Sequence, residues 1–369
     1  MNTALSPLSS KLSKIKIQDL INKKNKVLIS INEDASIEKA LELLQKYDIL
    51  ALPVYKWNLD KVKEFIGIIS IYDILANTVF QKFFDLIDKC ENSLDNLSFK
   101  TYLQVVKEED LFFNIKVKNI LGCTYESQES WVLHSSESLT NLLEMFTKNN
   151  YHRILIFDDE KFENREKNEL NETAEFYTIL TQTDIINFIF SNKSNFDLSS
   201  AEYDRIFNKE IKSLMELKKK NSLTDAEDPN QVSSNSINDR GIKVVTVQEE
   251  FSALNCFKVL YLHRVSAVAV VNAKGELIAN LSASDLRGMT KERMEDLLLP
   301  VFDFLEKTSS KRGIKKVRPD QIISVTDDEL VTKVLDTMIS KDLHRVWVVD
   351  DRDIPVGSFT QSDFLYSLV

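Results

Sequence analysis

The chain alternates between two hydrophobic spacings, and this alternation recurs along its length. Between residues 36 and 47, apolar residues fall every three or four positions, which is typical of one face of a helix. Short runs rich in β-branched and aromatic residues predict strands at 27–31, 51–55 and 65–69. A second helix is predicted from Ile71 onward. The predicted unit therefore has the order β-α-β-β-α.

The same order of elements recurs three more times, at 131–190, 244–289 and 322–369. A seven-residue lead-in segment recurs as well, starting at Ile15, at Ile115 and, more loosely, at Lys209. Self-similarity at a fixed period indicates a repeat protein rather than one large domain. We therefore predict an α/β fold made of four small α+β repeats.

Polar and charged segments divide the repeats. The predicted divisions are a flexible N-terminal tail (1–14), repeat 1 (15–80), a helical connector (81–114), repeat 2 (115–193, with a solvated loop at 160–175), a connector and disordered linker (194–240), repeat 3 (241–290), a connector (291–318) and repeat 4 (319–369). The clearest linker is 218–241, which is too polar to bury a core. We place the boundary between two halves there, so that each half would hold two consecutive repeats.

Composition narrows the class of protein. The 369 residues contain no apolar run approaching the roughly 18 residues that a membrane helix needs, so no membrane partner is expected. A net charge of −10 argues against a nucleic-acid partner and requires that any anionic ligand be held by locally placed cations. Cys90, Cys123 and Cys256 are too far apart for a metal pair and are interpreted as buried small hydrophobes, and no metal site is predicted. Without an apolar N-terminal signal, we expect a cytoplasmic or nuclear protein.

Each repeat carries a hydroxyl residue three positions before an aspartate, between its last strand and its last helix. The pairs are Ser70 and Asp73, Thr181 and Asp184, Ser282 and Asp285, and Thr360 and Asp363. A capping box, which satisfies open N–H groups at a helix start, explains such a pair structurally. A nucleotide site explains it functionally, because a helix N-terminus and a hydroxyl attract phosphate while a carboxylate accepts from the two ribose hydroxyls. The two interpretations are compatible.

Basic residues supply the other half of the predicted site. His152 and Arg153 begin a strand in repeat 2, and His344 and Arg345 stand at the equivalent place in repeat 4. In repeat 3 the His-Arg pair that includes Arg264 falls before the equivalent place, and Ser266 occupies the histidine position. In repeat 1 that position is Leu50. The pairs in repeats 2 and 4 favour anion binding over two solvated histidines.

The repeats resemble CBS domains, and the four-repeat chain resembles the gamma subunit of AMP-activated protein kinase. The most specific pieces are H-R-I-L-I-F-D at His152, R-V-S-A-V-A-V-V at Arg264, H-R-V-W-V-V-D at His344 and G-S-F-T-Q-S-D at Gly357. The resemblance implies two paired (Bateman) modules forming a pseudo-symmetric disc. It also implies AMP, ADP or ATP as regulatory ligand, and kinase alpha and beta subunits as partners. The four aspartates would hold ribose, and His152, Arg153, Arg264, His344 and Arg345 would face phosphate.

Departures from the family pattern qualify this implication. Gamma subunits carry arginine where this chain has Leu50, and a Lys-Arg pair where it has Thr183 and Asp184. The long 291–307 segment, which contains L-L-L-P-V-F, also departs from the shorter gamma connection.

The repeats and their motifs are compatible with several functions. The first is an energy-sensing subunit of a kinase complex. The second is a stand-alone four-repeat regulator, for example a phosphatase inhibitor, and a scaffold without ligand is a further possibility. An enzyme is disfavoured, because no catalytic domain or catalytic motif remains once the repeats are assigned, and no catalytic cofactor is expected.

Overall fold

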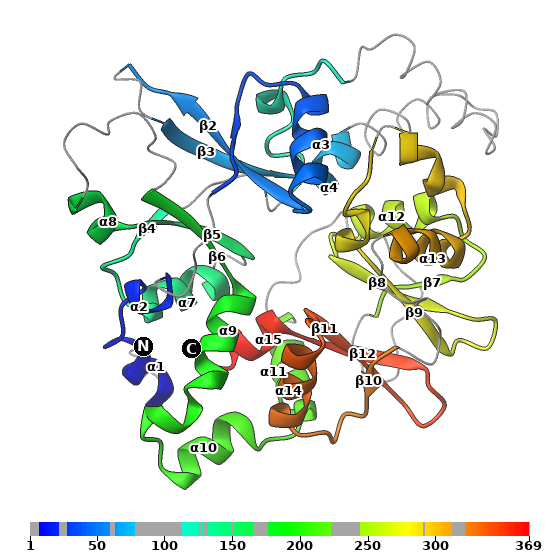
Figure 1. Ribbon diagram of the computed structural model, residues 1–369. Helices are drawn as coiled ribbons and strands as arrows, with labels where there is room; N and C mark the ends of the chain where they lie inside the picture. The colour runs from blue at the N-terminus through cyan, green and yellow to red at the C-terminus, as the bar shows by residue number, and fades with distance from the viewer. Residues whose placement is uncertain are drawn as a thin grey trace. The chain divides into compact units, whose positions relative to one another are not determined.

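The computed structural model describes most of the chain as four small sheets with their helices (Figure 1). The described residues are 7–21, 28–59, 63–77, 113–124, 127, 132–148, 151–164, 176–222, 244–290, 292–311 and 322–368. The helical connector predicted before 113, the core of the predicted linker at 223–243, most of the 160–175 loop and Cys90 lie outside them. Within them, no helix is long and apolar enough to cross a bilayer.

All four repeats are built in the predicted order. Repeat 1 comprises β1 (Ile31–Asn32), α3 (Ile37–Lys46), β2 (Ala51–Trp57), β3 (Lys63–Ser70) and α4 (Ile71–Leu75). Repeat 2 comprises β4 (Val132–His134), α7 (Leu139–Lys148), β5 (Arg153–Phe157), α8 (Asp159–Glu163), β6 (Tyr177–Thr181) and α9 (Gln182–Ser191). Repeat 3 comprises β7 (Thr246–Gln248), α12 (Ala253–Leu262), β8 (Ala267–Val271), β9 (Leu277–Ser282) and the short 3₁₀ helix η6 (Ala283–Leu286). Repeat 4 comprises β10 (Ser324–Val325), α14 (Val331–Ser340), β11 (Arg345–Val349), β12 (Pro355–Thr360) and α15 (Gln361–Tyr366).

Sheet register shows that the repeats are equivalent. In each sheet the first strand runs parallel to the second, and the second runs antiparallel to the third. The first residue of each middle strand lies opposite the hydroxyl residue of the repeated motif. These pairs are Ala51 and Ser70, Arg153 and Thr181, Ala267 and Ser282, and Arg345 and Thr360. Leu50 and Ser266 directly precede the middle strands of repeats 1 and 3, as His152 and His344 do in repeats 2 and 4. This register confirms that Leu50 and Ser266 hold the histidine position.

The repeats combine differently from the predicted halves. Unit 1 contains Met1–Leu28, Trp131–Val244 and Ile323–Val369, and unit 2 contains Ile29–Ser130 and Val245–Ile322. Repeat 2 thus packs with repeat 4, and repeat 1 with repeat 3. The boundary predicted at 218–241 is wrong as a division between these units, because the last helices of alternate repeats contact each other. In unit 1 α15 contacts α7 and α9, and in unit 2 α4 contacts η6 (Figure 1).

Each unit buries one apolar core. In unit 1, Phe146, Phe207, Phe359 and Phe364 are fully buried in one cluster. In unit 2, Phe113, Phe257 and Phe304 are fully buried in a second cluster. Cys256 is buried as predicted, and this burial raises the pKa of its thiol to about 12. Cys123 is only partly buried.

Lead-in segments bind the helix of another repeat through a reciprocal backbone bridge. The N–H of Ile17 donates to Glu137 O at 2.8 Å, and the N–H of Leu139 donates back to Ile15 O at 2.9 Å. Equivalent bridges join Ile115 and Val117 to Ala35 and Ile37, and Lys209 and Ile211 to Glu329 and Val331.

Repeat 3 receives a fourth bridge of this kind. The N–H of Ala253 donates to Leu299 O, and the N–H of Val301 donates to Phe251 O, both at 2.9 Å. The segment L-L-L-P-V-F is therefore a lead-in rather than only an insertion. It leads into α13 (Val301–Lys311), as the segment at Ile15 leads into α2 (Gln18–Ile21). The remaining connecting helices are α1 (Pro7–Leu12), η2 (Val117–Asn119), η5 (Lys193–Phe196), α10 (Ser200–Phe207), α11 (Ile211–Ser222) and η7 (Glu292–Leu298).

Candidate functional site

The four hydroxyl–aspartate pairs all form capping boxes, as the structural interpretation predicts. In repeat 4 the backbone N–H of Thr360 donates to Asp363 Oδ2 at 2.9 Å, and the Thr360 hydroxyl donates to the same oxygen at 2.7 Å. In repeat 2 Thr181 and Asp184 repeat this geometry, with both distances at 2.7 Å. Because the hydroxyls of Thr181 and Thr360 each give their one proton to their own aspartate, neither donates to phosphate in this arrangement. This differs from the sequence interpretation for these two residues.

The helix starts are engaged by the protein in other ways too. The first N–H of α15, from Gln361, donates to His344 O at 3.1 Å, and that of Ile71 donates to Leu50 O in the same manner. The N–H of Asp363 donates to the Thr360 hydroxyl at 3.2 Å. These N–H groups at the helix starts therefore already donate to acceptors within the protein.

The two His-Arg pairs lie in the same unit. Arg153 begins β5 opposite Thr181, and Arg345 begins β11 opposite Thr360, so each pair stands beside a capping box. His152 and His344 directly precede these strands. The equivalent positions in unit 2 are Leu50 and Ala51 in repeat 1 and Ser266 and Ala267 in repeat 3. Unit 2 thus has no basic side chain at the places where unit 1 has four.

The charges of the two His-Arg pairs act on each other. The His344 side chain is exposed at the surface, but nearby protein removes much of the water around its imidazole. This partial desolvation lowers the pKa of the imidazole. The positive charges of Arg345, and of Arg153 and His152 from the other repeat, lower this pKa further. Asp342 opposes the shift. The basic residues of repeats 2 and 4 therefore form one electropositive cluster, which we call the unit 1 cationic cluster (His152, Arg153, His344 and Arg345).

Two hydrogen bonds join the helix starts beside this cluster. The Thr183 hydroxyl donates to Gln361 Oε1 at 3.0 Å, and the Ser362 hydroxyl donates to Gln182 Oε1 at 2.9 Å. The pattern is reciprocal, since each repeat supplies one hydroxyl and one amide oxygen. Both glutamines are buried. Sequence reasoning missed them, although the letters T-Q-T-D and T-Q-S-D occur only in repeats 2 and 4.

Asp73 differs from the other motif aspartates. Its exposed fraction is 0 %, and its Oδ2 accepts from the Ser70 N–H at 2.7 Å. Its Oδ1 accepts from the Thr124 N–H at 3.1 Å and from the Thr124 hydroxyl. Burial raises the pKa of this carboxyl, against the effect of its hydrogen bonds. The structure therefore does not place Asp73 where a ribose would reach it, contrary to the expectation from sequence.

Arg264 lies out of register with Arg153 and Arg345, as the sequence alignment of the repeats predicts. It has φ 50°, which is the left-handed conformation that Asp48 and Asp342 adopt just after α3 and α14. Arg264 thus ends helix α12 and lies three residues before Ala267, which holds the position of Arg153. Ser266 is exposed, and its carbonyl oxygen accepts from the Ala283 N–H at 3.2 Å. Asp285, the aspartate of the repeat 3 motif, is partly buried and forms a capping box with Ser282.

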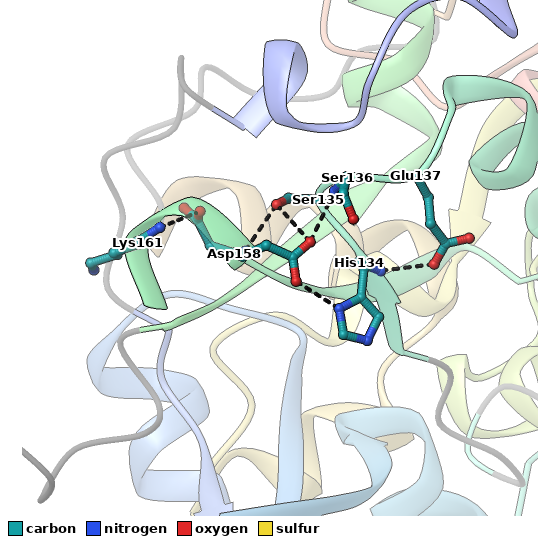
Figure 2. Close-up of polar contacts among 7 residues, drawn as sticks. His134, Ser135, Ser136, Glu137, Asp158 and Lys161 are labelled. Carbon is teal, nitrogen blue, oxygen red and sulfur yellow. Dashed lines mark hydrogen bonds and ion pairs between the residues drawn. The ribbon is translucent and has the colours of Figure 1, made fainter. Parts of the chain in front are cut away.

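A second polar cluster, also missed from the sequence, lies at the end of β4 (Figure 2). His134 Nδ1 lies 2.8 Å from Asp159 Oδ1, and the Ser136 N–H donates to Asp159 Oδ2 at 3.0 Å. Burial alone would raise the pKa of Asp159, but hydrogen bonds from His134 and Ser136 lower it overall. The Asp159 N–H donates to the buried Ser135 hydroxyl at 3.0 Å. These contacts anchor α8 on β4.

Comparison with known proteins identifies the repeat. The family model for the CBS domain matches residues 18–78 and 314–369, which lie in the first and fourth repeats. The matched residues identify the first and fourth repeats as CBS domains. The second and third repeats have the same topology and register as these two.

Relatives of full length are gamma-like regulatory subunits. The SNF1-related protein kinase regulatory subunit gamma-like PV42a of Arabidopsis thaliana is 24% identical, over 97% of this chain and 96% of that protein. Protein SDS23 of Kluyveromyces lactis is 24% identical over 90% of this chain, but over 56% of its own length. The crystal structure of protein MJ1225 from Methanocaldococcus jannaschii, whose description relates it to g-AMPK, superposes with a TM-score of 0.56 at 17% identity. That match covers 96% of this chain and 100% of MJ1225 and supports the fold.

Proposed function

We propose that this CBS protein is an adenine-nucleotide-binding regulatory protein whose unit 1 cationic cluster holds the phosphate of AMP, ADP or ATP. The observation that carries the proposal is the convergence of two His-Arg pairs beside two capping boxes in unit 1. Four basic groups in a chain of net charge −10 form the kind of locally placed cationic site that an anionic ligand requires.

The chemistry of the cluster suits a nucleotide. Arg153 and Arg345 are permanently charged and can donate paired hydrogen bonds to phosphate oxygens. Each neighbouring aspartate uses Oδ2 for its cap. A carboxylate can accept more than one hydrogen bond, so the same aspartate is also suited to accept from the ribose hydroxyls, which are donors. Asp184 and Asp363 are therefore the proposed ribose acceptors, whereas Asp73 is not.

Regulation rather than catalysis is the proposed activity. The similarity to the gamma-like subunit PV42a over 97% of the chain supports a place in an SNF1-type kinase complex, with alpha and beta subunits as partners and a site of action in the cytoplasm or nucleus. The similarity to SDS23 over 90% of the chain favours a second candidate, a CBS regulator that acts outside such a complex. Co-purification with kinase alpha and beta subunits would support the first, and a monodisperse free protein in their presence the second.

Calorimetric titration of the full chain with AMP, ADP and ATP tests nucleotide binding. Arg153→Ala or Arg345→Ala should weaken binding about ten- to hundredfold, which is the effect of losing a charge-assisted hydrogen bond. Arg352→Ala is the matched control, because Arg352 is a 78% exposed arginine that pairs with Asp350 outside the cluster. Equal affinities for all four proteins, or no binding of any nucleotide at millimolar concentration, would overturn the proposal.

A further inference from the structure

The buried glutamines beside the cationic cluster contact both repeats at once. Gln182 Nε2 donates to Tyr151 O at 3.0 Å, and Gln361 Nε2 donates to Leu343 O at 3.4 Å. These two carbonyl groups belong to the residues directly before His152 and His344. Each amide therefore holds the backbone that leads into the His-Arg pair of its own repeat.

The amide oxygens complete the connection. Gln182 Oε1 accepts from Ser362, and Gln361 Oε1 accepts from Thr183, so each glutamine also holds the helix start of the opposite repeat. Two continuous paths result, one from Tyr151 to Ser362 and one from Leu343 to Thr183. We call these four side chains (Gln182, Thr183, Gln361 and Ser362) the glutamine clasp.

The equivalent positions of unit 2 cannot form a clasp. Ile71 and Ala283 stand in place of the glutamines, and neither side chain has a hydrogen-bonding group. Ser284 contacts Ser282 of its own repeat at 2.6 Å instead. The clasp therefore occurs in the same unit as the cationic cluster.

We infer that Gln182 and Gln361 are positioning residues that join the His-Arg pairs of repeats 2 and 4 into one shared anion site, which takes one phosphate group per unit. The inference rests on the proposed function. The positive charges of the cluster repel one another, as their effect on His344 indicates, and one phosphate held by both pairs relieves that repulsion. Two phosphates in the same cluster would repel each other in turn. A rigid connection between the repeats lets both His-Arg pairs act on the same ligand.

The shared anion site can be tested by NMR, because the chain contains only four histidines. Selectively labelled protein is titrated with AMP while the imidazole resonances of His152 and His344 are followed. A shared site requires both resonances to shift along one isotherm with one Kd. His134 and His263 serve as internal references. Two different Kd values for His152 and His344 would overturn the inference while leaving nucleotide binding intact, whereas no shift of either would overturn the proposed function itself.

The clasp is tested by removing its hydroxyls. In Thr183→Val/Ser362→Ala the basic residues and glutamines remain, and we expect His152 and His344 to separate onto two isotherms that differ severalfold in Kd. The matched control is Thr337→Val/Ser340→Ala on α14, whose hydroxyls bond only within that helix. If the clasp variant does not fold, Gln361→Met replaces it. A purely structural role would lower the melting temperature but keep a single isotherm, and that result would overturn the inference.

Discussion

Asp73 and Asp363 hold the same position in their repeats but have different surroundings. Both cap a helix through Oδ2. The second oxygen of Asp73 is enclosed by Thr124, from the segment after the repeat 2 lead-in, and the side chain is cut off from water. Asp363 is partly exposed, and its capping partner Thr360 lies opposite Arg345 in the sheet. One motif thus serves structure in repeat 1 and is proposed to serve ligand binding in repeat 4.

This difference predicts that removing the Asp73 carboxylate lowers stability and leaves the response to ligand unchanged. Asp73→Ala should lower the free energy of unfolding by about 3 kcal/mol, because it removes the buried carboxylate that accepts from the Ser70 N–H and from the N–H and hydroxyl of Thr124. The AMP-induced shift of His344 should be unchanged. Urea unfolding measures the first effect and NMR titration the second, with the exposed Asp303→Ala as control for stability. Loss of the AMP response in a stably folded Asp73 variant would contradict the structural role.

At the level of elements, the lead-in of repeat 4 has the same core positions as that of repeat 1. Val301, Phe304 and Leu305 are buried, as are their counterparts Ile17, Leu20 and Ile21. The sequence did not reveal this, because Pro300 and two phenylalanines obscure the I-x-I-x-x-L-I pattern.

The fourth lead-in can be tested by core truncation. Val301→Ala should destabilise unit 2 by about 2 kcal/mol, since it removes buried methyl groups and leaves a cavity. Asp303→Ala, on the exposed side of the same helix, should have little effect. Denaturant unfolding distinguishes the two, and equal midpoints would show that this segment does not carry the core contact assigned to it.

The local sequence pattern predicted most of the structure within each repeat but little of how the repeats combine into units. The helix from 36 to 47 and the four capping boxes could be predicted, because helical spacing and S/T-x-x-D describe contacts within a few residues. The combination of alternate repeats could not, because it depends on contacts between residues far apart, such as Thr183 with Gln361. The glutamine clasp was missed for the same reason. The enclosure of Asp73 by Thr124 also spans about fifty residues of sequence.

Across the molecule, the two units have one architecture and different electrostatics. Unit 1 gathers His152, Arg153, His344 and Arg345, whereas Leu50 and Ala267 in unit 2 are apolar at equivalent places. The sequence predicted these basic residues and, in repeat 3, Arg264, which lies just after α12 and out of register with Arg153 and Arg345. The proposed phosphate site therefore belongs to one unit only.

The cationic cluster should make nucleotide binding depend on pH. Desolvation, Arg345, Arg153 and His152 lower the pKa of His344 below its ordinary value of 6.5 in the free protein, so the imidazole is mostly neutral at pH 7.5. A bound phosphate favours the imidazolium and raises that pKa. Binding therefore takes up a proton, and affinity should rise as the pH falls from about 8 toward 6.5.

Proton uptake can be measured directly by titrating AMP at pH 7 in buffers of different ionisation enthalpy. We expect a positive uptake, of up to about one proton, that decreases in His344→Gln. His134→Gln controls for loss of a histidine outside the cluster. AMP itself titrates near pH 6, but this contribution is common to all three proteins, so the difference between them isolates His344. Identical proton uptake in the wild type and His344→Gln would mean that the phosphate does not approach this imidazole, and the ligand would then have to be held by the arginines alone.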